Sequence, residues 1–311
     1  MGQPLHILGP LRHDCTGCGG CCHGVIVFLK PAEQEKLRVQ ARELGKPEPV
    51  EEGHIAFSHG RCPFQEDDDL CLVHRRYGLA EKPLLCQQYP LVLSRCEGEV
   101  RAGVDPGCYD GWKSWRDGPA LQPRAGAVEP RPLGAAARRM EGRVLDLLDA
   151  PGLGLLQLAA LLADERPDAG GLPPRFMRGA LAAFQRARMS RGVDPERTGA
   201  RLAAVLGPLF AHLEALDPSD LPPAPALTAE QQAFAIDVIQ RMIFLRMVLG
   251  VGPVVVATLG AVGAIACGWS DPAPEVFGPA VAGWARAMRS PAVLEVLGPE
   301  LSALLPPVVE R

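Results

Sequence analysis

A chain of 311 residues is long enough for two domains of ordinary size, and a hydrophobic content of 47% supplies a buried core. The formal net charge of −4 gives no overall attraction to nucleic acid or anionic lipid, so we expect neither as a partner. Glycine and proline, with 34 and 31 residues, stay below the share that indicates wholesale disorder.

The most informative segment runs from Cys15 to His23 and holds four cysteines separated by glycines. In a C-x2-C-x2-C spacing three thiolates can converge on one point, and both tetrahedral zinc sites and iron-sulfur clusters use such short loops. Cys21 and Cys22 are adjacent, and successive side chains point to different sides, so we do not expect both to serve one mononuclear metal. The segment predicts a metal site.

Other uses of cysteine are possible in principle. Ten cysteines are an even number, as in a disulfide framework, but residues 1–14 show no charged start followed by an apolar run. Without a visible secretory signal, we expect a reduced, cytoplasmic protein. Cys267 lies alone in an apolar stretch and is expected to be a buried, inert thiol. His23 is expected to contact a thiolate or solvent rather than to ligate the metal.

Short, mixed elements are predicted after the cysteine segment. The acidic run Glu66–Asp69 is interpreted as a solvated hairpin turn rather than a hard-cation site. The expected elements are a strand at Val25–Leu29, a helix at Pro31–Leu44, a short strand at His54–Phe57, and a hairpin formed by Leu91–Leu93 and Glu99–Val104.

The chain changes character at residues 118–132, which are rich in proline, glycine and alanine and are predicted to be a linker. Thr228 and Gln231 have the spacing of a capping box. Helices are expected at 133–148, 153–163, 174–189, 195–216, 228–249, 254–267, 274–288 and 291–305. The sequence therefore predicts an α+β protein, with a small irregular cysteine-rich metal-binding domain at 1–117 and an all-helical domain at 133–311.

Residues 247–270 carry no charge and are long enough to span a membrane. The stretch is dominated by valine, alanine and glycine, contains Pro253 and follows an amphipathic helix, so a buried central helix is favoured over a membrane span. Arg241 and Arg246 on the preceding helix are interpreted as part of a solvated face rather than as contacts to an acidic ligand.

The order of the cysteine motifs resembles the bacterial YkgJ-type cysteine-cluster proteins, also described as the CxxCxxCC zinc- or iron-chelating domain. The family pattern is C-x2-C-x2-C-C, a cysteine near a proline, Cys-x-Ile-Tyr, Arg-Pro-x-x-Cys-Arg-x-Phe/Tyr and a final cysteine. Over roughly residues 14–112, it is met by Cys15 to Cys22, Cys62-Pro63, Cys71 to His74, Lys82 to Tyr89, and Cys108.

The resemblance is imperfect at three positions: Val73-His74 replaces Ile-Tyr, and Lys82 and Gln87 replace arginines. Cys96 has no place in the pattern. The metal ligands that the resemblance implies are Cys15, Cys18, Cys21, Cys22, Cys62, Cys71, Cys86 and Cys108.

The metal is predicted to be iron in a [4Fe-4S] cluster rather than zinc, because of the ferredoxin-like triplet, the Cys62-Pro63 pair and the surplus of thiols. One or two centres are compatible with the sequence. The family includes flagellin lysine N-methylases, so the resemblance also implies S-adenosylmethionine-dependent methylation of a protein substrate. No strand followed by G-x-G-x-x-G and a helix is visible to support it. The alternative is a non-catalytic metal-binding interaction module whose helices bind a partner.

Overall fold

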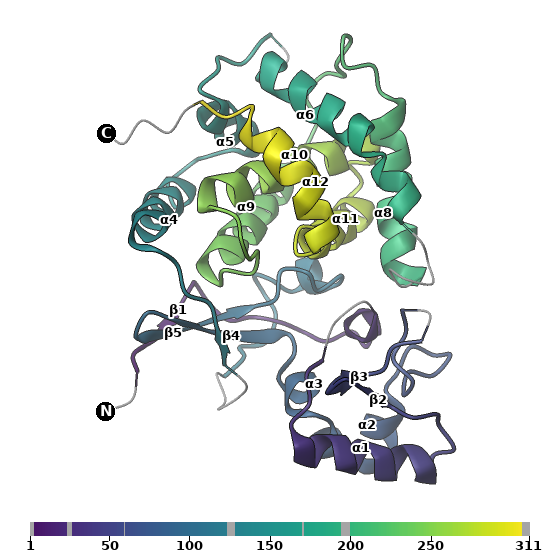
Figure 1. Cartoon of the computed structure of the whole chain (residues 1–311). Helices are drawn as coiled ribbons and strands as arrows, with labels where there is room; N and C mark the ends of the chain where they lie inside the picture. Colours follow the sequence, from purple (N-terminus) through teal and green to yellow (C-terminus); the bar gives the residue numbers. More distant parts are fainter. Residues whose placement is uncertain are drawn as a thin grey trace.

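A four-stranded sheet lies beneath the helices and beside the cysteine-rich lobe, which we define as residues 15–90 (Figure 1). The computed structural model describes residues 3–23, 27–58, 60–122, 128–169, 171–193 and 200–306. The strand order is β1-β5-β4-β6. The strands are β1 (Leu5–Ile7), β4 (Leu91–Cys96), β5 (Glu99–Val104) and β6 (Glu129–Pro130).

Strands β4 and β5 form the predicted hairpin. They pair antiparallel, with Leu91 opposite Val104 and Cys96 opposite Glu99, and Gly98 in the turn has a φ of 94° that favours glycine. Strand β1 adds to β5 in parallel, although almost the whole lobe separates them in sequence. The buried face of this sheet has its own apolar cluster, formed by Leu11, Leu91, Leu93, Ala102 and Val104.

Short elements surround a second apolar cluster in the cysteine-rich lobe. Leu37, Ile55, Phe64 and Val73 are each at most 2% exposed there. In the expected strand Val25–Leu29, residues 25 and 26 lie outside the described part of the chain. The elements are η1 (Gly20–Cys22), α1 (Pro31–Glu43), β2 (Val50–Glu51), β3 (His54–Ile55), α2 (Leu72–Tyr77), η2 (Leu79–Glu81) and α3 (Leu84–Gln88).

The carboxy-terminal region is helical, as predicted. The Thr228 hydroxyl accepts a hydrogen bond from the Gln231 backbone amide, and the Gln231 side-chain oxygen accepts one from the Thr228 backbone amide, so the predicted capping box begins α9. The first residues of the helix expected at 195–216 lie outside the described residues. The elements are η3 (Gly111–Lys113), α4 (Ala135–Leu148), α5 (Leu155–Ala163), α6 (Pro174–Ala187), η4 (Met189–Gly192), α8 (Ala200–Ala215), α9 (Ala229–Phe244), α10 (Pro253–Ser270), α11 (Pro274–Ala287) and α12 (Pro291–Ser302).

Helix α10 is the central helix of this region. Among the described residues it is the one helix long and apolar enough to cross a membrane, and 78% of it is buried inside the protein. It packs against α4, α5, α8, α9, α11 and α12. This burial agrees with the expected core helix, because a helix surrounded by other helices is apolar on all sides.

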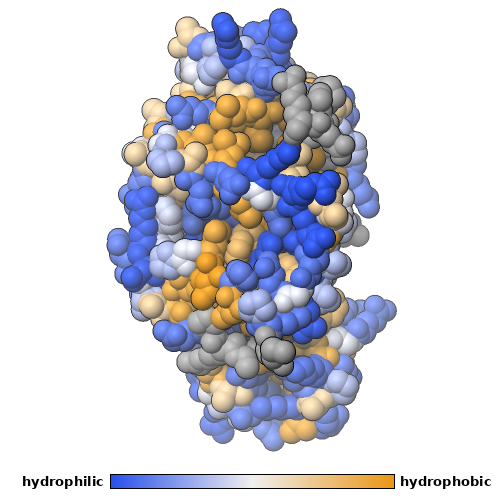
Figure 2. All heavy atoms as spheres, turned by 90° about the vertical axis from the view of Figure 1, so that its left-hand side faces the viewer, coloured by the Kyte–Doolittle hydropathy of each residue, from blue (hydrophilic) through white to orange (hydrophobic). Residues whose placement is uncertain are grey.

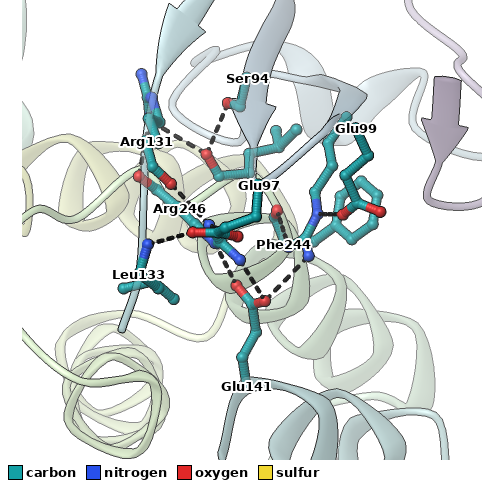
Figure 3. A network of polar contacts seen from close by, with 10 residues as sticks. Ser94, Glu97, Glu99, Arg131, Leu133, Glu141, Phe244 and Arg246 are labelled. Carbon is teal, nitrogen blue, oxygen red and sulfur yellow. Dashed lines mark hydrogen bonds and ion pairs between the residues drawn. The ribbon is translucent and has the colours of Figure 1, made fainter. Parts of the chain in front are cut away.

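Helix α9 was expected to continue to residue 249, but it ends at Phe244. The carbonyl groups at its end accept hydrogen bonds from outside the helix, as Figure 3 shows: Arg101 donates to Phe244, and Ser94 donates to Leu245. Arg246 then takes a φ of 50°, which turns the chain away. The sequence could not reveal these donors, because they come from strands far away along the chain.

The expectation that Arg241 and Arg246 form a solvated face is wrong. Arg241 is 5% exposed and pairs with Asp237 at 2.7 Å. Arg246 is equally buried, and its guanidinium pairs with Glu141 of α4 at 2.8 Å and with Glu97 of the β4–β5 turn at 2.7 Å (Figure 3). A buried charge requires such partners: Arg241 has its partner within α9, whereas Arg246 joins α4 to the β4–β5 turn.

The segment predicted as a linker contributes to the sheet in its described parts. Ala120 bridges to Arg12, and β6 pairs in parallel with β4 through Ser94 and Arg95; residues 123–127 lie outside the described chain. At the opposite edge, Leu5 and Ile7 of β1 are 48% and 45% exposed. On this side of the molecule, which Figure 2 shows, apolar atoms lie among mostly hydrophilic ones.

Candidate metal centre

The cysteine segment is held in a tight turn. Gly19 has a φ of 68°, and a Cβ atom on it would lie 2.6 Å from Asp69. A Cβ atom on Gly20 would lie 2.4 Å from the Tyr109 ring. The close approach of neighbouring residues therefore requires these glycines, and they let η1 place Cys21 and Cys22 against the rest of the lobe.

Backbone pairing brings later cysteines to this turn. The amide of Cys62 donates to the carbonyl of Cys22 at 3.0 Å, and His23 forms an antiparallel bridge with Arg61. An antiparallel β-bridge joins Gln65 and Cys71, which lie on either side of the acidic run Glu66–Asp69. This pairing confirms the predicted hairpin turn. Cys71 then occupies the N-cap position of α2.

Five cysteines line one cavity of about 240 Å³ between the lobe, the sheet and the helical region. The cysteine wall is flanked by apolar side chains such as Phe64 and Leu85 and by Lys82. All ten cysteines of the chain are free thiols. The cysteines of the cavity are Cys21, Cys22, Cys62, Cys71 and Cys86.

Three of the eight predicted ligands do not line the cavity. Cys18 and Cys108 lie near each other: burial raises the pKa of Cys108, and the neighbouring Cys18 raises it further. Cys15 is exposed, three residues before Cys18. The structure therefore divides the predicted ligand set into a group of five and a separate pair, with Cys15 outside both.

The two remaining cysteines are remote from these groups. Cys96 is fully buried in β4, close to Arg101 and Arg246, and burial raises its pKa. Cys267 is 1% exposed in the middle of α10, and burial raises its pKa as well. Both have the surroundings of structural thiols, as the sequence indicated for Cys267.

The thiols of the cavity differ in acidity. Burial raises the pKa of Cys62 to about 12 and that of Cys86 to about 12. The sulfur atoms of Cys21 and Cys22 lie 4.0 Å apart. Their hydrogen bond lowers the pKa of Cys21 to about 6 and raises that of Cys22, while Lys82 also favours the Cys21 thiolate. Metal binding must therefore displace protons from buried thiols, which makes affinity rise with pH.

Lys82 is the nearest cation to these thiols. Burial acts against its charge, but Cys71, Cys86 and Cys21 more than offset this and raise the pKa of its ammonium group. Within the described residues no carboxylate pairs with Lys82, so its charge is directed to the cavity. A thiolate centre carries negative charge, which such a cation stabilises.

Arg286 of α11 connects the helical region to the cysteine turn. Its guanidinium donates to the carbonyl of Gly20 at 2.8 Å, of His23 at 3.0 Å and of Gly107 at 2.6 Å. It also donates to the Tyr89 hydroxyl at 3.2 Å and stacks on the Tyr109 ring, with 4.6 Å between Cζ and the ring centroid. These carbonyls flank Cys21, Cys22 and Cys108, so one side chain fixes the backbone of both thiol groups.

No histidine or carboxylate among the described residues completes a metal site. His23 is buried and lies 4.0 Å from Asp69, and it does not line the cavity. Within the described ranges, no three Cys, His, Asp or Glu side chains stand close enough to hold an ion in their present orientations. The five thiols thus share one cavity without converging on one point, and coordination requires them to turn towards a common centre.

Five free thiols around one cavity are the donor set of a thiolate metal-binding domain. Residues 14–108 match the family model CxxCxxCC, described as a "putative zinc- or iron-chelating domain". This stretch of the chain is therefore similar to domains of this zinc- or iron-chelating family. A search of curated proteins found no match, and a search of solved structures found none either.

Several residues at or near the site were not predicted from the sequence. Lys82 was noted only as a departure from the family pattern, and His74, at the family's tyrosine position, is exposed and does not line the cavity. No pattern in the sequence indicated that Arg286, Asp105 or Arg289 lies near the cysteines. They reach the site through the fold, because α11 follows Asp105 by well over a hundred residues.

Proposed function

We propose that the protein binds a [4Fe-4S] cluster in the cavity lined by Cys21, Cys22, Cys62, Cys71 and Cys86. The observation that carries the proposal is the presence of five free thiols around one cavity of about 240 Å³. A [4Fe-4S] cluster takes four cysteine ligands, so the set is sufficient and one thiol is left over.

The size of the cavity favours a cluster over zinc. A structural zinc ion is enclosed by four ligands at about 2.0–2.3 Å and leaves no open volume between them. Here the thiols surround an open space with apolar walls, including Phe64 and Leu85, and with Lys82 beside it. An apolar wall shields a cluster from water, and a nearby cation offsets the negative charge of four thiolates.

Elemental analysis of protein purified without oxygen or added metal tests the proposal. We expect about four irons and four sulfides per chain, with a broad absorption band that bleaches on reduction. Cys62→Ser should lower the iron content, whereas Cys267→Ser, a matched change of a buried thiol, should not. One or two zinc ions without colour would overturn the cluster and leave a structural thiolate site.

An enzymatic role extends this proposal. Resemblance to flagellin lysine N-methylases points to methyl transfer from S-adenosylmethionine to a lysine of a protein substrate. The observation that favours chemistry is that the cavity continues past the thiols to Met247 and Arg289 of the helical region, which leaves room for a reactant. Calorimetry with metal-loaded protein tests the extension. Absence of S-adenosylmethionine binding would favour the non-catalytic interaction module, whose helices bind a partner protein.

A cytoplasmic location fits this function. Free thiols persist where cellular reductants keep them reduced, and all ten cysteines are free. Redox-state labelling of the thiols in intact cells would test the location, because an oxidising compartment would convert them to disulfides.

A further inference from the structure

A second cavity shares no lining residue with the cysteine cavity. It measures about 150 Å³ and lies where the beginnings of α9 and α11 meet the segment around η3. Aromatic residues make up only 5% of the chain, yet four aromatic side chains line this one space, which we call the aromatic cavity. The four are Trp112, Trp115, Phe234 and Phe277.

The fold itself positions the two tryptophans of the aromatic cavity. A Cβ atom on Gly278 would lie 2.4 Å from the Trp112 ring, so only glycine lets this ring lie so close to α11. Trp115 meets Phe234 edge to face, with 5.7 Å between the ring centroids. The cavity is therefore formed before any ligand enters it, as is usual for small-molecule sites.

The tryptophan rings already attract cations of the chain itself. The Cζ atom of Arg116 lies 4.4 Å from the Trp115 centroid, and Arg116 does not line the cavity. The Nζ atom of Lys113 lies 6.0 Å from the Trp112 centroid, which is the outer limit of a cation–π contact. The same ammonium group pairs with Asp110 at 3.0 Å, so Lys113 is exposed and neutralised beside the rings. The space between the rings stays open.

One carboxylate lines the aromatic cavity, that of Glu230 in the first turn of α9. Its side chain is exposed, and within the described ranges it has neither an ion pair nor a hydrogen bond. Thr228 and Gln231 are bonded to each other in the capping box, and Gln231 also donates to the Pro272 carbonyl at 2.6 Å. The wall therefore offers four rings and one uncommitted carboxylate, a combination that attracts an organic cation.

The size of the aromatic cavity limits the kind of cation. Pockets for drug-sized ligands measure about 300–1,000 Å³, so a space of about 150 Å³ holds one head group rather than a whole molecule. A methylated ammonium group suits such walls better than a bare one. Its methyl groups bury apolar surface against the rings, and a quaternary nitrogen has no N–H group that would lose a partner on burial.

We propose that the aromatic cavity binds a quaternary ammonium group, with the four rings around its methyl groups and Glu230 beside its charge. The group belongs either to a small molecule such as choline or to a trimethylated lysine of a partner protein, because the same chemistry recognises both. The inference goes beyond the proposed metal centre and does not depend on it, since the two cavities have separate walls.

Titration calorimetry on the full-length protein tests the inference with two molecules of the same shape. Choline is compared with its uncharged carbon analogue, in which a tert-butyl group replaces the trimethylammonium group. We expect one molecule of choline to bind per chain, at least about tenfold more tightly than the analogue. Equal binding of the two would show an apolar pocket without preference for a cation and would overturn the inference.

Peptides distinguish the two sources of the group. A short peptide with trimethyllysine is titrated beside the same peptide with unmodified lysine. Tighter binding of the methylated peptide than of choline would assign the site to a protein partner, and the reverse order would assign it to a small molecule. Failure of both choline and the methylated peptide to bind would refute the proposal.

Variants locate the binding. Glu230→Gln and Trp115→Leu should each weaken binding of the tighter ligand at least about threefold, because one removes the neutralising carboxylate and the other a ring. Glu275→Gln is the matched control, since Glu275 is exposed in the first turn of α11 and does not line the cavity. Lys113→Gln removes a competing cation and should bind at least as tightly as the natural protein. Unchanged affinity in both cavity variants, or weaker binding by Lys113→Gln, would contradict the inference.

The indole N–H groups report on the rings themselves. In isotope-labelled protein, the ligand should shift the nuclear magnetic resonance signals of Trp112 and Trp115. The signals of Trp269 and Trp284, which do not line the cavity, should stay in place. Shifts confined to Trp269 and Trp284 would place the cation elsewhere and rule out the aromatic cavity as its site.

Discussion

Arg286 is the residue on which the conformation of the cysteine turn depends most. It is half-buried and donates to three backbone carbonyls beside Cys21, Cys22 and Cys108. Partners that orient metal ligands typically contribute about 10- to 100-fold in metal affinity. We therefore expect Arg286→Met to lower metal affinity by at least about tenfold, as measured by competition with a chromophoric chelator.

Lysine should not rescue this position. A single ammonium group cannot reproduce the planar fork of donors that reaches separate carbonyls, so Arg286→Lys should lose metal nearly as readily as Arg286→Met. Arg178→Met provides the control, because Arg178 is an exposed arginine on α6. Unchanged metal affinity in Arg286→Met would show that the turn holds its shape without α11.

Thiol reactivity also belongs to the residue scale. In metal-free protein at pH 7, we expect iodoacetamide to modify exposed Cys15 and the Cys21–Cys22 pair before Cys62 and Cys86. The pKa of Cys21 is lowered to about 6, so this pair holds a thiolate at neutral pH, whereas burial keeps Cys62 and Cys86 protonated. Mass spectrometry of the digested protein gives the order. Modification of Cys62 before Cys21 and Cys22 would contradict the expected order. Metal loading should protect the cavity thiols from iodoacetamide.

Among the elements, the β4–β5 turn, α4 and the end of α9 meet at one buried ion-pair network. Arg246 and Glu141 are 5% and 3% exposed, and Arg101 also pairs with Glu141 at 3.0 Å (Figure 3). Removing one partner of a buried pair leaves a charge without compensation, which costs about 3–5 kcal/mol. Arg101 still compensates part of the Glu141 charge, so Arg246→Met should cost about 3 kcal/mol of unfolding free energy.

A double variant separates pairing from packing. Arg246→Met combined with Glu141→Leu should be less destabilised than Arg246→Met alone, because no buried carboxylate is left without its partner. Arg186→Met removes an exposed pair with Glu300 and should cost less than about 1 kcal/mol. Denaturant unfolding followed by circular dichroism gives all three values. An equal loss of unfolding free energy in the single and double variants would mean that the network stabilises the fold through packing rather than through charge compensation.

Local chemistry made most of the helices predictable. Pro274 and Pro291 stand at the first positions of α11 and α12, and the Thr228 capping box begins α9; each satisfies or removes groups that a helix start leaves unpaired. The end of α9 was missed because its carbonyl groups are bonded by distant side chains. Helix starts depend on adjacent residues, whereas this helix end depends on tertiary contacts.

The site was predictable only in part for the same reason. The spacing from Cys15 to Cys22 identified a metal-binding segment, but spacing could not show that Cys15 and Cys18 lie outside the cavity that Cys21 and Cys22 line. Nor could it show Arg286, which is 266 residues from the Gly20 carbonyl that it binds. The identity of the ligands among the eight cysteines stays a prediction.

On the scale of the whole molecule, the cysteine-containing part and the helical part are joined by side chains from both. Arg289 pairs with Asp105, Arg246 pairs with Glu97, and a Cβ atom on Gly278 would meet the Trp112 ring at 2.4 Å. Several of these contacts are buried and charged. The division into domains at 1–117 and 133–311 stays a prediction, but contacts of this kind couple the stability of the two parts.

Coupling of this strength predicts that metal release and helix unfolding coincide. When metal-loaded protein is heated, the midpoint of metal release to a chromophoric chelator should match the midpoint of ellipticity loss at 222 nm, a signal to which the helical region contributes most. Loss of the metal removes the binding free energy that holds the cysteine turn, and the turn in turn holds Arg286 of α11. Arg246→Met should lower both midpoints together. Metal release well below the temperature of helix unfolding would show instead that the helical part folds independently, and that Arg286 supports the metal centre without depending on it.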